Sequence, residues 1–349
     1  MPTPSSAFGS QLSKQKTTTA SAQSSFSFHC LRIPCFSALA ASDNVANVRV
    51  ETMGGHVVER KKPGSTRQSW QWLALALLSS MAPQRAKTLS IGLAEMTMND
   101  IESIERVMRH PNPLQLLLPD VTSAELQFVS LKHGAKAFPR QETPAGHGFM
   151  LQRAWSRVAV VSDESSVPRL QVLMPGYGVC WVERSDTSPT HPSELQNSRA
   201  IVDQLEVWEL GKSSSDAILR LLEMLGRDIR RLVIRSTRSS IAEDWLRQAL
   251  SYLPNLKELS FQHSSISSLQ PAIEVLDNLE SLAVVTCELA DSSLLQLLKL
   301  LADDQVPKSA SLKHLKLTPH WRSREDEWQG VLDALLTTLQ QNKRISECI

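Results

Sequence analysis

The side chains that could carry chemistry in this chain of 349 residues are better suited to binding than to catalysis. Trp208, Arg231 and Arg235 fall within one short stretch of the C-terminal half. Tryptophan and arginine dominate the energetic hot spots of protein–protein interfaces, because each buries a large area and keeps polar groups for hydrogen bonds. These residues therefore indicate a surface that recognises another protein.

Motifs for phosphate binding and metal binding are missing from the sequence. It contains no G-x-x-x-x-G-K-[ST] and no strand followed by G-x-G-x-x-G. His263, His314 and His320 could meet as metal ligands, but neither cysteine nor carboxylate accompanies them at ligand spacing. The sequence therefore predicts a protein that is not an enzyme and holds no cofactor or metal.

A hydrophobic triplet, L-x-x-L-x-L, defines the elements that would position these side chains. Its middle residues lie 27, 27, 23 and 33 positions apart, with helix-period segments between the copies. Strands that alternate with helices in one chain direction predict a parallel sheet with the helices on one side. The copies are Val202/Leu205/Val207, Ile229/Leu232/Ile234, Leu256/Leu259/Phe261, Leu279/Leu282/Val284 and Leu312/Leu315/Leu317.

Three further copies precede residue 120, at Val45/Val48/Val50, Ala86/Leu89/Ile91 and Pro113/Leu116/Leu118. Asn99, with Glu102 three residues later, predicts a helix start between the last two of them. Ile345 and Cys348 are spaced as the beginning of one more copy. The triplets thus define repeats over residues 43–119 and 200–349.

Residues 120–199 lack helical periodicity and carry strand-like runs punctuated by glycine and proline, over 125–131, 149–161 and 170–182. They predict a β-rich insertion between the two groups of repeats. Residues 1–42 contain no acidic residue and are rich in serine and threonine, which is typical of a disordered tail or an organelle-targeting segment.

The triplets, their 27-residue steps and the intervening helices resemble the ribonuclease-inhibitor-like leucine-rich repeat superfamily. The resemblance implies an α/β solenoid, a horseshoe with a parallel concave sheet and convex helices, here interrupted by a small β-rich insertion. It also implies a protein-binding scaffold that uses the concave face. The asparagine or cysteine that the family usually has after the triplet is matched only by Cys287.

Side chains between the triplet leucines would point out of the sheet in three columns, because strand residues alternate between faces. The columns are Gln204, Arg231, Glu258, Ser281, His314; then Glu206, Val233, Ser260, Ala283, Lys316; then Trp208, Arg235, Gln262, Val285, Thr318. The predicted partner-binding residues are Trp208, Glu206, Arg231, Arg235, Gln262, His314 and Lys316. Trp208 is either the exposed anchor of this surface or a residue covered by the β-rich insertion.

Composition narrows the partner and the compartment. The net charge of +1 offers no basic face for nucleic acid, and no apolar run is long enough to span a membrane. Five scattered cysteines without a C-x-x-C pair argue against a disulfide framework. We therefore expect a cytoplasmic monomer that binds another protein, with an organelle address through residues 1–42 as the alternative.

Two other functions remain open from the sequence. The first is a substrate receptor of a ubiquitin ligase, in which the Trp- and Leu-rich segment Arg67–Ser80 would serve as a docking helix. That segment would equally serve as the helix that links two triplets. The second is an enzyme, or a regulator of one, sited in the 120–199 insertion, which would require a deep pocket with converging ionisable groups.

Overall fold

The computed structural model describes residues 23–27, 47–51, 65–79, 88–92, 96–118, 121, 125–144, 147–164, 166–174, 177–190, 202–211, 214–237, 239–289, 291–303, 311–318, 325–342, 345 and 347–348. Statements below refer to these residues.

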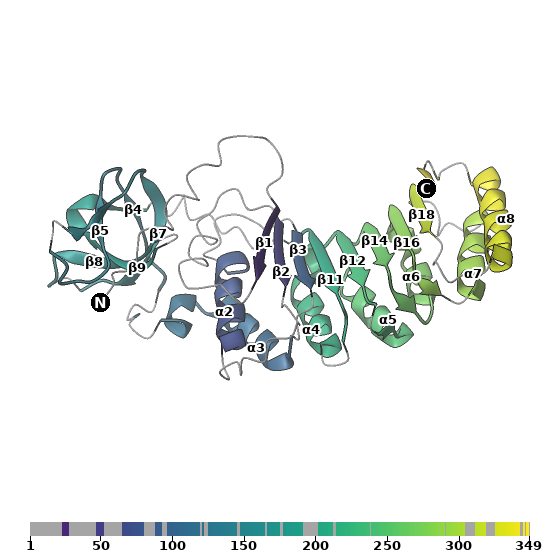
Figure 1. Ribbon diagram of the computed structural model, residues 1–349, viewed down its shortest axis with the longest axis horizontal. Helices are drawn as coiled ribbons and strands as arrows, with labels where there is room; N and C mark the ends of the chain where they lie inside the picture. The colour runs from purple at the N-terminus through teal and green to yellow at the C-terminus, as the bar shows by residue number, and fades with distance from the viewer. Residues whose placement is uncertain are drawn as a thin grey trace, which may run out of the picture.

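A parallel sheet runs through the molecule (Figure 1). Nine strands of the described chain form it, in the order β1-β2-β3-β11-β12-β14-β16-β18-β19. Their bounds are Gln23–Ser27, Asn47–Glu51, Thr88–Gly92, Gln204–Trp208, Arg231–Arg235, Glu258–Gln262, Ser281–Val285, His314–Thr318 and Glu347–Cys348. The parallel pairing is confirmed, and the middle triplet leucines are in register from Leu205 to Leu315. Cys348 continues this row beside Leu315, as its spacing predicts.

Helices line one side of this sheet (Figure 1). They are α2 (Ser65–Leu77), α3 (Met98–Arg109), α4 (Ser215–Leu225), α5 (Glu243–Ser251), α6 (Gln270–Glu274), α7 (Asp291–Ala302) and α8 (Glu325–Gln341). Short 3₁₀ turns at Pro113–Leu116, Gly226–Asp228 and Leu276–Asn278 join helices to strands. Two-residue strands β13 (Ser240–Ile241), β15 (Ser265–Ile266) and β17 (Glu288–Leu289) form a small parallel sheet after β12, β14 and β16.

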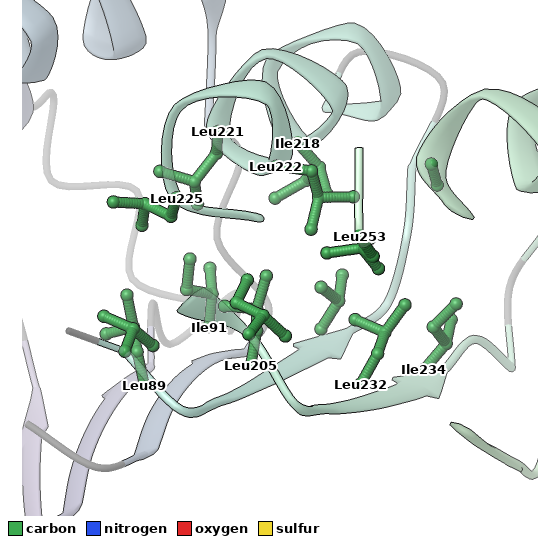
Figure 2. Close-up of a cluster of buried hydrophobic side chains, with 14 of the residues drawn as sticks. Leu89, Ile91, Leu205, Ile218, Leu221, Leu222, Leu225, Leu232, Ile234 and Leu253 are labelled. Carbon is green, nitrogen blue, oxygen red and sulfur yellow. The ribbon is translucent and has the colours of Figure 1, made fainter. Parts of the chain in front are cut away.

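The core lies between the parallel sheet and the helices. Figure 2 shows Leu205 and Leu232 pointing from their strands toward Leu222 of α4, and all three side chains are fully buried. Burying a leucine stabilises a fold by roughly 1.5–3 kcal/mol, so the row of triplet leucines is the main source of stability in this part of the chain.

A second sheet is antiparallel and contains seven strands within the described residues, in the order β10-β4-β7-β8-β9-β5-β6. Their bounds are β4 Phe128–Leu131, β5 Lys136–Phe138, β6 Phe149–Met150, β7 Trp155–Ser162, β8 Arg169–Met174, β9 Gly178–Glu183 and β10 Thr187–Pro189. One face is buried throughout: Val158, Val160 and Val172 belong to a core of this sheet alone. Ala159 and Val161 on the opposite face pack into the core of the parallel sheet.

The predicted fold class, a leucine-rich-repeat solenoid (horseshoe) interrupted by a small β-rich insertion, is wrong. The structure is a mixed α/β protein with a parallel sheet and a separate antiparallel one. Its connections are not copies of one unit, since α6 has 5 residues and α8 has 17. Thr88 and Gln204, neighbours on β3 and β11, are 116 residues apart in the chain. The antiparallel sheet fills that connection and has its own core.

Local predictions fail where capping and proline decide the backbone. Pro113 begins a 3₁₀ turn capped by the Asn112 side chain, so the predicted triplet at Pro113/Leu116/Leu118 is not a strand. Helix α3 is capped by Thr97 and not by Asn99: Thr97 and Asp100 exchange side-chain and backbone hydrogen bonds of 2.9 and 3.3 Å.

The N-terminal segment also differs in part from the prediction. Residues 23–27, within the predicted tail of residues 1–42, form strand β1 beside β2. The other residues of that tail lie outside the described part, so the prediction of a disordered tail or a targeting segment stays a prediction for them.

Candidate functional site

The candidate site is the face of the parallel sheet that points away from the helices, here called the open face. The strand register confirms the three predicted columns: Arg231, Glu258, Ser281 and His314 are neighbours, and so are the members of the other two. The sheet thus positions all seven predicted partner-binding residues on one face. Their role in binding a partner stays a prediction.

On the open face, side chains of the three neighbouring strands β3, β11 and β12 contact one another. Glu206 Oε2 accepts hydrogen bonds from Ser90 Oγ at 3.1 Å and from Trp208 Nε1 at 3.3 Å. The Arg235 guanidinium carbon lies 4.4 Å from the centre of the Trp208 ring. We call Ser90, Glu206, Trp208 and Arg235 the tryptophan cluster.

The tryptophan cluster changes the interpretation of Trp208. Both alternatives from the sequence placed its partner elsewhere, either in another protein or in the β-rich insertion. Instead, Arg235 of the neighbouring strand stacks on the ring, and Glu206 accepts its N–H. Stacking a guanidinium on a tryptophan ring stabilises by about 0.5–2 kcal/mol. Trp208 therefore already makes, within the chain, the stacking contact and the hydrogen bond that a partner protein would otherwise offer it.

The next strand pair repeats this internal pairing. Arg231 Nε lies 3.4 Å from Glu258 Oε2 across β12 and β14, and both side chains are partly exposed. Val233, which the alternation of the strand places on the open face between Arg231 and Arg235, is nevertheless only 1 % exposed. The middle column is therefore covered at β12, although its residues point to the open face.

A groove opens where those side chains end, over β14, β16 and β18. Its volume is about 480 Å³, within the size range of ligand sites. Ala283 of the middle column lies on its floor, and Lys316 lies at one end with its side chain exposed. The remaining lining residues are Arg231, Glu258, Leu259, Ser260, Gln262, Ser281, Val285, His314 and Leu315.

Several polar groups in the groove have no partner within the described residues. Lys316 makes no ion pair or hydrogen bond there, and neither does the hydroxyl of Ser281. The amide of Gln262 donates to Ser260 Oγ at 3.0 Å, which leaves its carbonyl oxygen to accept. The groove therefore presents donors and an acceptor that a bound molecule could satisfy.

The rim of the open face is built from residues in the left-handed conformation. Glu209, His263 and Thr286 each follow a strand and have φ of 55°, 49° and 49°. Each donates its backbone N–H to the last carbonyl of the next strand, at 2.6, 2.9 and 3.0 Å. The turn directs the following residue inward, so that Ser264 and Cys287 are buried.

Ser264 and Cys287 play structural roles at this rim. Ser264 Oγ accepts from the backbone N–H of Ser236 at 2.9 Å and donates to the Gln262 carbonyl at 2.9 Å. The sequence singled out Cys287 and missed Ser236, a small polar residue that is fully buried in the turn after β12. Burial raises the pKa of the Cys287 thiol to about 11, so this cysteine is protonated and unreactive at neutral pH.

The other candidate sites gain no support from the structure. The interior of the antiparallel sheet is apolar, and it holds Val172, Val182 and the free Cys180, whose pKa burial raises to about 11. Within the described residues, no group of three or more His, Cys, Asp or Glu side chains could hold a metal ion. His320 lies outside the described residues.

The segment proposed as a docking helix is part of the core. Helix α2 buries Trp70, Trp72 and every residue from Leu73 to Leu78 against the sheet and α3. A ligase that bound these side chains would first have to unfold this layer. The helix is therefore the connection between β2 and β3.

Fold and site together define an α/β protein with a polar groove on the face of a parallel sheet that lies opposite to the described helices. No protein-family model, curated protein or solved structure matches the chain, so its class is stated from the structure alone. None of the helices in the described part has the length and apolar character needed to cross a bilayer.

Proposed function

We propose that this chain is a non-enzymatic scaffold that binds another protein on the open face of its parallel sheet, with the β14–β18 groove at the centre of contact. One observation carries the proposal: among the described residues, polar side chains of the groove lack partners, and they lie on the face opposite to the described helices. A buried polar group without a partner costs free energy, whereas an exposed one is available to a ligand.

The backbone makes this surface suitable for binding. Strand hydrogen bonds and the buried leucine row hold the groove residues in place, so little conformational entropy is lost when a partner docks. The free cysteines Cys180 and Cys287 fit a reducing compartment, and we propose the cytoplasm as the place where binding occurs.

The proposal is tested by filling the groove. The full chain, immobilised, captures partners from an extract of its source cells, and the captured proteins are identified by mass spectrometry. The variant Ala283→Trp places an indole on the groove floor and is expected to lose the proteins that the unmodified chain captures reproducibly. The matched control is Ala242→Trp, because Ala242 is exposed and lies before α5, outside the groove.

Two results decide the matter. Loss with Ala283→Trp and retention with Ala242→Trp support binding at the groove. Equal capture by all three proteins would place binding elsewhere and end the proposal. Circular dichroism and urea unfolding establish first that both variants are folded.

A further inference from the structure

The charged residues that line the groove indicate which kind of ligand it could bind. Of the charged residues that line it, Arg231 and Glu258 form an ion pair with each other. Lys316 at the opposite end has no ionic partner in the part of the chain that the structure describes. The groove thus has one charge compensated within the protein and one positive charge that is not.

Two other lysines, Lys313 and Lys257, form ion pairs with Glu280, outside the groove. Lys313 and Lys257 lie 2.9 and 3.7 Å from the carboxylate oxygens of Glu280. None of these three residues lines the groove. The two lysines, chiefly Lys313, hold the pKa of the Glu280 carboxyl below its usual value. Glu280 is therefore already paired with other cations.

Apart from Glu258, the acidic residues that the register places on this face near the groove lie on strands beyond its ends. In the middle column, Glu206 is three strands from Ala283. In the flanking column, Glu347 is one strand beyond His314. Among the described residues that line the groove, the carboxylate of Glu258 is already paired with Arg231, so the carboxylate of a ligand could pair with Lys316.

The dimensions suit an extended peptide. Adjacent strands are about 4.8 Å apart, so the three steps from β12 to β18 span roughly 14 Å, the length of about four extended residues. Across that span, the Ser281 hydroxyl could donate to a peptide carbonyl, and the Gln262 carbonyl oxygen could accept a peptide N–H. Ala283 and Val285 provide an apolar surface between these groups.

We propose that the groove binds an extended acidic segment of the partner protein, with an aspartate or glutamate side chain on Lys316 and a small apolar side chain over Ala283 and Val285. The proposal rests on the scaffold function above and adds the chemistry of what is bound. The segment crosses the strands over the open face, so it does not add a strand to either edge of the sheet.

Two pools of fluorescein-labelled eight-residue peptides test this proposal with the full chain. In both pools, one fixed position differs and the other seven hold alanine, valine or serine at random. The fixed position is aspartate or glutamate in the acidic pool and asparagine or glutamine in the amide pool. Fluorescence anisotropy is expected to show binding of the acidic pool and at least 10-fold weaker binding of the amide pool, since a charge-assisted hydrogen bond contributes that much.

Charge reversals locate the contact. Lys316→Glu is expected to weaken binding of the acidic pool by about 10-fold or more, and Lys316→Arg should retain most of it. Lys313→Glu is the matched control, because Lys313 precedes the same strand, is exposed, and lies outside the groove. Equal binding of both pools, or equal losses in Lys316→Glu and Lys313→Glu, would overturn the selection for a carboxylate.

The Ala283→Trp variant separates this proposal from the scaffold function. If neither pool binds while Ala283→Trp still abolishes partner capture, the acidic segment is wrong and the scaffold function stands. If neither pool binds and Ala283→Trp captures the same proteins as the unmodified chain, both proposals are wrong.

Discussion

On β11 and β12, side chains of the open face hydrogen-bond and stack on one another, whereas on β16 and β18 they face solvent. The two regions share one backbone geometry and one set of columns. Trp208 and Arg235 have the composition of an interface hot spot, yet they use that chemistry on each other. Lys316 and Ser281 look less distinctive, and their side chains have no partner in the part of the chain that the structure describes. Composition thus identifies groups that can bind, and pairing within the fold decides which of them are available.

The sharpest way to break this comparison is to place the same large side chain at two positions of one column. Val233→Trp should lower the free energy of unfolding by about 3 kcal/mol, because Val233 is covered and an indole would overpack the site. Ala283→Trp should change it by less than about 1 kcal/mol, since its floor position is open. Urea unfolding measures both, and equal losses would show that the two halves of the face are packed alike.

The second test removes the centre of the tryptophan cluster. Trp208→Ala should reduce stability by about 2 kcal/mol, because a partly buried ring, its stacked guanidinium and one hydrogen bond are lost together. Trp208→Phe, which keeps a ring beneath Arg235, should lose less than half as much. Partner capture should survive both changes. Unchanged stability with lost capture would restore Trp208 as the anchor of the interface.

A third test concerns the ion pair at the boundary between the two regions. A double-mutant cycle with Arg231→Ala and Glu258→Ala should give a coupling energy of about 0.2–1 kcal/mol, because both side chains are partly exposed. The coupling should shrink between 50 mM and 1 M NaCl as the charges are screened. A larger coupling that salt does not change would indicate that this end of the groove is drier than the structure shows.

The smallest effect is expected from Glu280, beside the groove. Its folded pKa lies below the ordinary value of 4.5, mainly because of Lys313, so its contribution to stability is complete above that value and is lost as pH falls through the folded pKa. Glu280→Gln should therefore unfold at slightly lower urea concentration than the unmodified chain at pH 7, and at the same concentration at about pH 2. A difference that persists at that pH would have a cause other than this charge.

The sequence predicts most of the parallel sheet and little of what covers it. Leucines such as Leu232 and Leu259 repeat at strand spacing and fix both register and facing, because a shift of one residue would expose the whole row. Hydrophobic periodicity takes no account of the backbone limits that proline imposes, so it predicts a strand at Pro113/Leu116/Leu118 where the structure has a 3₁₀ turn. It also cannot reveal that the antiparallel sheet has a core of its own, which depends on contacts between distant segments.

The sequence predicts which face of the sheet the candidate residues share, and it does not predict how exposed each of them is on that face. Alternation places Val233 and Ala283 on the same side of the sheet, and the register confirms it. Val233 is nevertheless buried, whereas Ala283 lines the groove. That difference is a property of tertiary packing, so no pattern of residue types along the chain encodes it directly.

The left-handed residues at the rim have a consequence for engineering. Glu209, His263 and Thr286 each hold a conformation that costs a residue with a Cβ about 1–2 kcal/mol and costs glycine almost nothing. Glycine at any of the three would relieve that strain, but it would also remove a side chain that forms a hydrogen bond at the rim, Glu209 with Thr237 or Thr286 with His263. Because His263 and Thr286 directly follow the groove residues Gln262 and Val285, any thermal resistance gained there would come at the edge of the groove itself.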